Sequence, residues 1–199
     1  MPWFEPRRWP CWLTYALTVG IAGFEMMVLA RALSPDADAA YRAYFIDRTT
    51  TCLDKPIPET YRLGTTVSFL PDGRRAAAEI RVCGWSNPVG NGTHSIGQSS
   101  RLRVKFDKPP NDLAVFVKFT SSRPQRVVLS ANGRVIGHMS LPGSEVEVEA
   151  RFLVSREVAG LQESLEIEFE YPDAFLPNPR TSDTHRRAVR LLEFRVEPS

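Results

Sequence analysis

A stretch of twenty residues near the N-terminus, Cys11 to Ala30, is apolar apart from two threonines and Glu25. At about 1.5 Å per helical residue it covers about 30 Å, which is the thickness of the hydrocarbon core of a bilayer. A helix on the surface of a soluble protein needs apolar residues along one stripe only, whereas here they run all round. The sequence therefore predicts a single membrane-spanning helix over residues 11–32, with a folded domain after it.

The residues that flank this stretch predict its orientation. Three of the four tryptophans lie within the first twelve residues, as expected for rings that settle at the level of the lipid headgroups. Arg7 and Arg8 precede the stretch, whereas only Arg31 follows it directly. Because basic residues favour the cytoplasmic side, residues 1–10 are predicted to be cytoplasmic and the C-terminal domain to lie outside.

A cleaved signal peptide is the alternative interpretation of this stretch. Ala30-Arg31-Ala32 would then be the cleavage site of small residues. The apolar run is longer than the core of a usual signal peptide, about 7–15 residues, and this favours a retained anchor.

Glu25 is the one charged residue of the stretch and the fifteenth of its twenty positions, roughly 7–8 Å from the outer end by helical rise. An acid at that depth costs about 2–3 kcal/mol unless it is protonated, paired or close to water. One interpretation is a glutamate that is neutral or reaches water, and the other is a polar contact with a second transmembrane helix. Gly20 and Gly23 would give such a helix a narrow surface to approach.

The rest of the chain divides into an exit segment or linker, residues 33–60, and one domain of ordinary size, residues 61–199. Residues 33–199 contain 22 basic and 21 acidic side chains. This nearly balanced charge argues against nucleic acid as a partner, because a protein that binds nucleic acid needs a basic face.

The three cysteines of the chain differ in their predicted surroundings. Cys11 lies in the apolar stretch and is most simply a small apolar residue. Cys52 and Cys83 both lie in the outer part of the chain, where oxidation is permitted, and they are predicted to form a disulfide. Closing a loop of about 30 residues would stabilise the domain by roughly 3 kcal/mol. Two buried free thiols are the alternative.

Short runs that alternate between apolar and polar residues dominate residues 61–199 and predict an all-β domain. Pro71-Asp72-Gly73 is predicted to form a turn, and Asn132-Gly133 is the strongest hairpin signal in the chain. Eight or nine strands with a hydrophobic period of two predict a β-sandwich of jelly-roll type, with a barrel as the alternative. The predicted strands are Thr65–Leu70, Ala77–Cys83, Arg101–Phe106, Leu113–Thr120, Gln125–Ala131, Arg134–Ser140, Glu145–Phe152, Leu165–Tyr171 and Ala188–Val196.

Two of these strands carry a row of glutamates on one face, and such a row is more often the solvent face of a strand than a site for a cation or a substrate. Arg101, Arg103 and Lys105 share one face of another strand and could form cross-strand ion pairs with the glutamates, each worth about tenths of a kcal/mol. The side chains predicted to point inward from the glutamate-rich strands are Val146, Val148, Ala150 and Phe152 on the first, and Leu165, Ile167, Phe169 and Tyr171 on the second.

The sequence contains no motif for catalysis, whether a nucleophile elbow, a zinc-binding His-Glu pair, a phosphate-binding loop or a dinucleotide-binding glycine pattern. The three histidines, His94, His138 and His185, lie far apart and have no carboxylate or cysteine at the spacing of metal ligands. A pairing of His94 with Ser95 is disfavoured, because adjacent residues rarely face each other. The sequence therefore predicts a non-enzymatic protein without metal or cofactor.

Residues 84–100 form a long glycine- and serine-rich segment, and loops of this kind are often functional. Together with the strand after it, GWSNPVGNGTHSIGQSSRLRVKF resembles the G-W-S-x-P-E-x-W-G-x-W-S-x-G signature of β-sandwich domains in bacterial envelope proteins. Those domains are attached to phosphoglycerol-transferase-like and glycosyl-transferase-like polypeptides. Near the C-terminus, SDTHRRAVRLLEF is similar to the S-D-x-R-x-L-G-V-x-L segment that ends many of them. The resemblance covers residues 61–196 and implies a bacterial inner-membrane protein with a periplasmic domain.

Three positions of the signature differ in this chain. Val89 stands in place of the glutamate, while Asn91 and His94 stand in place of the two later tryptophans. Aromatic faces and a carboxylate are the groups with which a protein surface binds sugars, so the departures bear on ligand binding. Trp85 is either a platform for a sugar or a core residue. The residues that match are Gly84, Trp85, Ser86, Pro88, Gly92, Ser95 and Gly97, and the predicted contacts to a ligand or partner are Trp85, Asn87, Asn91 and His94.

These features predict a single-pass membrane protein that acts as an accessory or structural subunit of a larger inner-membrane complex. The complex would serve envelope glycan synthesis or export, or would be bioenergetic, and the partners would be the lipid bilayer and other transmembrane subunits. The helix would contact those subunits through Gly20, Gly23 and Glu25. The alternative is a membrane-tethered carbohydrate-binding module, whose sugar affinity would depend on Trp85.

Overall fold

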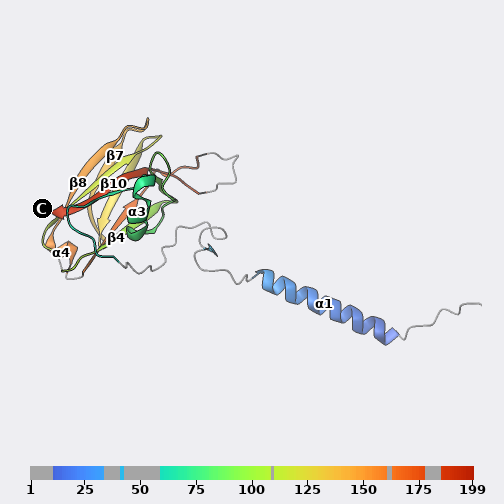
Figure 1. Ribbon diagram of the computed structural model, residues 1–199. Coiled ribbons are helices and arrows are strands. Elements are labelled where there is room, and N and C mark those ends of the chain that lie inside the picture. Colours follow the sequence, from blue (N-terminus) through green and yellow to red (C-terminus); the bar gives the residue numbers. More distant parts are fainter. Residues whose placement is uncertain (1–10, 34–40, 43–58, 109, 161–162, 178–184) are drawn as a thin grey trace, which may run out of the picture. The chain divides into compact units, whose positions relative to one another are not determined.

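The computed structural model describes residues 11–33, 41–42, 59–108, 110–160, 163–177 and 185–199 (Figure 1). The chain divides into two compact units, Met1–Asp38 and Ala39–Ser199. The predicted cytoplasmic segment, residues 1–10, and most of the predicted exit segment, residues 33–60, lie outside the described residues.

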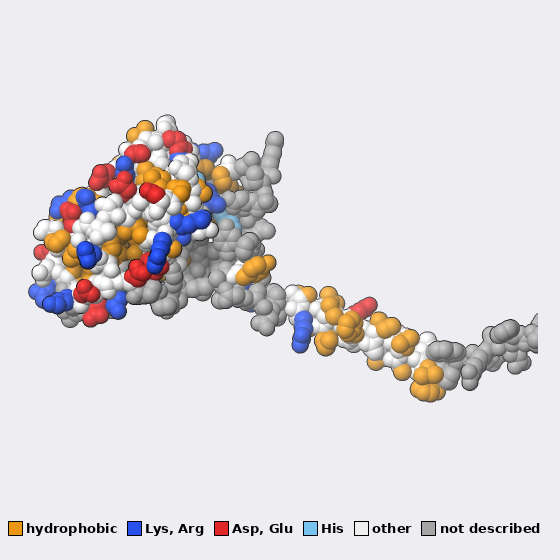
Figure 2. All heavy atoms as spheres, in the orientation of Figure 1, with side chains coloured by type: hydrophobic (Ala, Val, Ile, Leu, Met, Phe, Trp, Pro, Cys, Tyr) orange, Lys and Arg blue, Asp and Glu red, His pale blue; other side chains and the backbone are white. Residues whose placement is uncertain are grey.

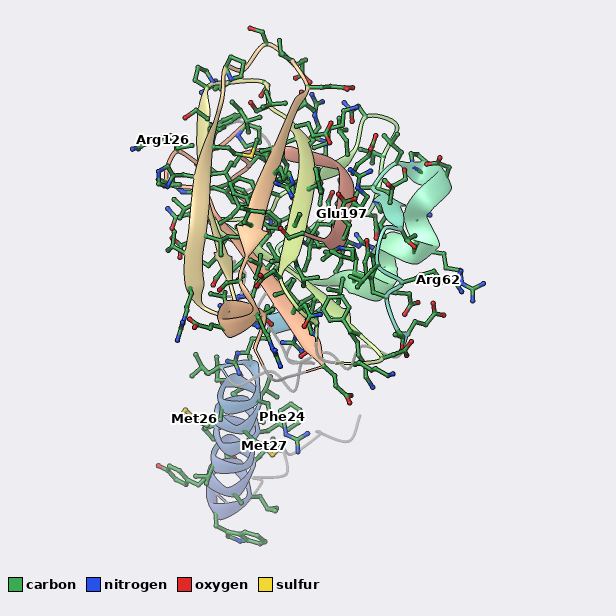
Figure 3. The ribbon with its side chains drawn as sticks, turned by 90° about the vertical axis from the view of Figure 1, so that its left-hand side faces the viewer. Phe24, Met26, Met27, Arg62, Arg126 and Glu197 are labelled. Carbon is green, nitrogen blue, oxygen red and sulfur yellow. The ribbon has the colours of Figure 1, made fainter. Side chains whose placement is uncertain are left out.

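The first unit contains one long helix, α1 (Cys11–Leu33). Its residues Trp12–Leu33 have a mean hydropathy of 1.6 and are long and apolar enough to cross a membrane, a test that a signal sequence near the N-terminus also passes. Hydrophobic side chains are spread along the visible face of the helix in Figure 2, and Phe24, Met26 and Met27 point to different sides of its axis in Figure 3. The helix therefore has no single apolar stripe, as its sequence predicts.

The second unit is a β-sandwich of two antiparallel sheets, which confirms the predicted fold class and excludes a closed barrel. The first sheet has the order β2 (Arg81–Cys83), β4 (Ser99–Lys105), β9 (Ser164–Glu170), β6 (Gln125–Ala131), β7 (Arg134–Leu141). The second sheet has the order β1 (Thr66–Ser68), β10 (Arg190–Pro198), β5 (Leu113–Thr120), β8 (Val148–Val154), and β3 (Thr93–His94) also pairs with β10.

The core lies between the two sheets and is formed by the inward rows of the alternating strands. Phe119 of β5 meets Phe169 of β9 edge to face, with ring centroids 5.4 Å apart, so this pair joins the two sheets. The predicted inward residues Leu165, Ile167, Phe169 and Tyr171 are all buried, which confirms the pattern assigned to this strand.

The hairpin between β6 and β7 turns at Asn132-Gly133, as predicted. Asn132 has φ 45° and Gly133 has φ 78°, the two positive angles that the tightest hairpin turn requires. The Asn132 amide donates to the carbonyl oxygens of Val158 and Ala159, in the short helix α4 (Arg156–Ala159), each at 3.0 Å. The hairpin is thereby held against the segment that follows β8.

The prediction of a strand over Ala77–Cys83 is wrong for its first half. A 3-10 helix (Pro71–Gly73, at the predicted turn) leads into α3 (Arg74–Ile80), and only Arg81–Cys83 is a strand. The segment RRAAAEI contains good helix formers, and Ala77 and Ile80, three positions apart, both face the core. A helical period therefore fits these residues better than a period of two.

The predicted strand Glu145–Phe152 begins later than expected, and Val146, predicted to point inward, is 51% exposed. The chain turns before it, because Gly143, Ser144 and Glu145 all have positive φ angles, of 85°, 59° and 62°. A strand cannot include such residues, so pairing starts at Val148.

The pairing of β4 with β9 confirms the predicted cross-strand ion pairs. Arg101 lies opposite Glu168, with Nη2 3.0 Å from Oε1, and Arg103 lies opposite Glu166, with Nε 2.9 Å from Oε2. These four side chains are each only partly exposed and bind one another. Glu166 and Glu168 of β9 are therefore neutralised by arginines of the neighbouring strand.

The two ends of the sandwich differ in what they carry. Thr60 forms a bridge with Lys105, the last residue of β4. Ser199 donates its backbone N–H to the carbonyl oxygen of Asp112, just before β5. Thr60 and Ser199 therefore lie at the same end of the sandwich, called here the entry end. The eight residues of β5 lead about 25 Å from there to the opposite, distal end. Arg62 at the entry end and Arg126 at the distal end point into solvent on opposite sides of the molecule (Figure 3).

Candidate functional site

The segment that the sequence predicts to be functional, residues 84–100, folds back on itself at the distal end. Trp85 and Ser95 form an antiparallel bridge, and the Ile96 N–H donates to the Gly84 carbonyl at 2.7 Å. At the tip, Val89 and Gly92 exchange backbone hydrogen bonds of 3.0 Å. The backbone of the segment is thus ordered by its own pairings, and β3 joins it to the edge of the second sheet.

Trp85 is partly buried and packs against the core of the sandwich. Its ring lies 6.2 Å from the Phe69 ring and 5.8 Å from the Phe169 ring, between centroids, and its indole N–H donates to the Arg101 carbonyl at 3.1 Å. These contacts favour the interpretation of Trp85 as a core residue over that of a platform for a sugar.

The other predicted contact residues of this segment separate into two groups. Asn87 and Asn91 are exposed on the outer part of the segment. His94, on β3, is half-buried and lines a cavity of about 440 Å³ at the distal end. The contacts predicted for these side chains stay predictions, and His94 is the one that the structure places in a cavity.

This cavity, called the distal pocket, is lined by six residues from separate parts of the chain. Its volume lies within the range of small-molecule sites, about 300–1,000 Å³. His94 comes from β3, Ser122 and Arg123 from the loop between β5 and β6, and the rest from the segments that flank residues 178–184. The lining residues are His94, Ser122, Arg123, Phe175, Pro177 and Arg187.

Backbone pairing positions the two sides of the pocket. Phe175 and Arg187 form an antiparallel bridge with hydrogen bonds of 2.9 and 2.8 Å, so their side chains project on the same side. The Arg187 Nη1 donates to the Ser95 carbonyl at 3.2 Å, and the Arg123 guanidinium stacks over the Phe175 ring, 4.4 Å from its centroid. The pocket thus presents an aromatic ring with a cation on its face.

The electrostatic surroundings of His94 are positive. Burial lowers its pKa below the usual value, and the nearby charges of Arg187 and Arg190 lower the pKa further. The imidazole is therefore neutral at pH 7, with one nitrogen that donates and one that accepts a hydrogen bond. Arg190 forms an ion pair with Glu145 at the margin of the pocket.

Two larger hollows lie elsewhere on the sandwich, each of about 720 Å³. One surrounds Asn132, Arg103 and Glu166, whose polar groups already bind one another or the backbone. The other lies at the entry end, beside Tyr61 and Phe106. The distal pocket differs from both in combining a stacked arginine, an aromatic ring and a neutral histidine.

Two further predictions concern a disulfide between Cys52 and Cys83 and a contact between α1 and another helix. Cys83 takes part in a disulfide, while Cys52 lies outside the described residues, so the pairing of these two cysteines stays a prediction. Gly20, Gly23 and Glu25 lie on α1, and a Cβ placed on either glycine would meet nothing within 4 Å. The helix contact predicted for them likewise stays a prediction.

Among the described residues no group of three His, Cys, Asp or Glu side chains is arranged to hold a metal ion. His94 is half-buried, His138 is exposed on β7 and His185 is buried.

No sequence pattern predicts a functional role for Arg123, Phe175 or Arg187. Each lies in a different loop or flanking segment, and none belongs to a motif. The segment after Leu165–Tyr171 contains a phenylalanine among prolines, PDAFLPNP, which is an unusual position for a large aromatic side chain. That phenylalanine is the one local signal that would have pointed to the pocket.

Neither a protein-family model nor a curated protein sequence matches this chain. Solved structures with a similar fold include a family 43 arabinoxylan arabinofuranohydrolase from Bacillus subtilis (10% identity, 71% of this chain, 28% of that chain, TM-score 0.43). Another is the CBM36-1 domain of a multidomain xylanase from the hindgut metagenome of Trinervitermes trinervoides (14% identity, 68% of this chain, 97% of that chain, TM-score 0.40). A third is a family 35 carbohydrate-binding module from Clostridium thermocellum (9% identity, 52% and 73%, TM-score 0.35). These likenesses describe the β-sandwich fold.

Proposed function

We propose that this chain is a non-catalytic glycan-binding module tethered to a membrane, with α1 as the anchor and the distal pocket as the binding site. In this proposal the membrane is a bacterial inner membrane, residues 1–10 are cytoplasmic and the sandwich is periplasmic, in agreement with the charge bias around α1.

The composition of the distal pocket carries the proposal. Phe175 supplies an aromatic ring on which the Arg123 guanidinium stacks, while Ser122, Arg123 and the neutral His94 supply hydrogen-bonding groups around it. A sugar residue has apolar C–H faces and a rim of hydroxyl groups, so it matches a ring surrounded by donors and acceptors. A volume of about 440 Å³ accommodates a short oligosaccharide rather than a long polymer.

The position of the pocket supports the same proposal. The chain enters the sandwich at the entry end, and the pocket opens at the distal end, about one strand length away. Thr60, just before the first strand of the sandwich, therefore lies about one strand length from the pocket.

Phe175→Ala is expected to weaken oligosaccharide binding roughly tenfold, because it removes the aromatic face of the pocket. The measurement is calorimetric titration of the full-length protein in detergent micelles with a panel of defined oligosaccharides. Val135→Ala is the matched control, since this side chain is 65% exposed on β7 and does not line the pocket. If no member of the panel binds the unsubstituted protein, or if Phe175→Ala binds as well as it does, the proposed site is wrong.

The second candidate function, an accessory subunit of a membrane complex, rests on Glu25. This glutamate lies within the apolar stretch of α1. A charged side chain in hydrocarbon is unfavourable in free energy unless another polar group binds it. A polar contact with a neighbouring transmembrane helix would remove that cost.

Glu25→Leu is expected to release membrane subunits that co-purify with the unsubstituted full-length protein in a mild detergent, as read by mass spectrometry. Met26→Leu, at the next position on the helix, is the control and is expected to retain them. Identical sets of co-purifying chains in all three samples would contradict the subunit hypothesis and leave α1 as a tether.

A further inference from the structure

The outer face of the second sheet carries two rows of side chains with different charge patterns. Each row crosses β10, β5 and β8 at positions that the strand register places directly opposite one another, so its side chains project on one face about 5 Å apart. The residues between them along the strands, Val115, Val117 and Phe194, are buried in the core, so both rows face outward. The first row is Arg195, Phe116 and Arg151, and the second row, two residues nearer the distal end on β5, is Glu193, Lys118 and Glu149.

Phe116, at the centre of the first row, is an aromatic side chain that is only partly buried. Two guanidinium groups lie over its ring, that of Arg195 at 4.4 Å from the centroid and that of Arg151 at 5.7 Å. Aromatic side chains and arginines are enriched at protein interfaces. The hollow beside the ring has a volume of only about 30 Å³, which is too small for a sugar. This composition therefore fits a broad, flat partner better than a small molecule.

The charged residues of the edge strand β8 are available to a partner. Lys118 on β5 already binds Glu147, with Nζ 2.7 Å from Oε2, and lies 3.6 Å from Oε1 of Glu193. Arg151 and Glu149 are exposed, and neither forms an ion pair with another residue that the structure describes. They lie two residues apart on one strand, about 7 Å by strand rise, which is too far for a direct contact with each other.

A second copy of this chain presents charges that match these two rows. A two-fold axis that runs between the rows and across the strands places the first row of each copy against the second row of the other. Arg151 then lies opposite Glu149 of the second copy, and Arg195 lies opposite the second copy's Glu193. Each of these contacts occurs twice. A two-fold axis parallel to the strands would instead place arginine opposite arginine and glutamate opposite glutamate, which is unfavourable.

We propose that the outer face of the second sheet binds a second copy of this chain, in a symmetric dimer that pairs Arg151 with Glu149 in both directions. Two rows across three strands form a smaller contact than the roughly 800 Å² per partner of a stable complex, so the dimer is weak. Copies anchored in one membrane meet at a high effective concentration, which favours a weak contact of this kind. The inference goes beyond the proposed glycan binding, because none of these residues lines the distal pocket.

The test is fluorescence energy transfer between donor-labelled and acceptor-labelled full-length protein in lipid vesicles at low salt. Arg151→Glu and Glu149→Lys are each expected to weaken the association about tenfold, because each places like charges opposite each other twice. An equimolar mixture of the two variants is expected to restore it. In the mixed dimer the introduced acid meets the introduced lysine, and the other Arg151–Glu149 contact is unchanged.

Arg134→Glu is the control, because it makes the same change of charge at an exposed position on β7 of the other sheet, and it is expected to keep the association. Absence of transfer in the unsubstituted protein would overturn the inference, as would a mixture of the two β8 variants that does not recover. Transfer that Glu25→Leu abolishes, and that both β8 variants leave unchanged, would also overturn it and would assign the association to α1.

Discussion

Trp85→Ala is expected to lower the free energy of unfolding by about 3–4 kcal/mol. The indole ring is partly buried, packs against the rings of Phe69 and Phe169, and donates a hydrogen bond to the Arg101 carbonyl. Truncation removes the buried part of this aromatic surface and leaves a hollow beside two core rings. It also leaves the Arg101 carbonyl without this donor, which adds to the cost.

The measurement is urea-induced unfolding of the full-length protein in detergent micelles, followed by circular dichroism because the substitution removes a fluorescent residue. Val89→Ala, in the same segment but 43% exposed, is the control and is expected to change stability by less than about 0.5 kcal/mol. Should Trp85→Ala leave the unfolding midpoint unchanged while removing oligosaccharide binding, the side chain would be a ligand platform instead of a core residue.

Gly84→Ala is expected to destabilise the domain by about 2–4 kcal/mol, from two separate causes. Gly84 has φ 73°, a left-handed conformation that an L-residue adopts at a cost of about 1–2 kcal/mol. A Cβ at this position would also lie 2.4 Å from the Ser99 carbonyl oxygen and 2.6 Å from the Ser100 Cα. Both atoms belong to the backbone of the segment that begins β4, so they cannot move aside cheaply.

Gly64→Ala separates these two causes. Gly64 has φ 84°, close to that of Gly84, but a Cβ there would meet nothing within 4 Å. Unfolding of both variants in urea is therefore expected to show a loss of about 1–2 kcal/mol for Gly64→Ala and a larger loss for Gly84→Ala. Equal losses would mean that β4 relaxes to accept the methyl group, and that the close approach does not constrain the fold.

Both expectations concern the first two residues of the segment that resembles the envelope-domain signature. In this chain, Gly84 permits a close backbone approach and Trp85 packs against the core. The match at these positions is thus explained by folding requirements. Of the three positions where the chain departs from the signature, Val89 and Asn91 are exposed on the outer part of the segment and His94 lies at the pocket.

The period of two in the sequence predicts most of the sandwich, because it depends on local geometry. Alternate side chains of a strand point to opposite faces, so Leu165, Ile167 and Phe169 had to share the buried face once the segment was extended. The turn at Asn132-Gly133 is equally local, since positive φ angles select these two residues. The apolar helix α1 follows from composition and length alone.

Sequence patterns failed where two local periods compete. The spacing of the apolar residues Ala77 and Ile80, three positions apart, favours a helix, whereas the valine and cysteine after them favour a strand. Contact with the core favours the helix as far as Ile80. Val146 continues an alternation that the turn at Gly143–Glu145 interrupts. In both cases the outcome depends on packing and backbone angles beyond the local pattern.

An apolar helix followed by an all-β domain, and the buried faces of the main strands, can be predicted from the amino-acid sequence alone. The packing of Trp85 against the core, and the cavity that is lined by His94, Arg123, Phe175 and Arg187, are visible only in the folded domain. The difference arises because hydrophobic burial follows a local period, which is visible along the chain. A pocket formed by loops depends instead on the pairing of strands about 100 residues apart, such as β3 with β10, which no local pattern specifies.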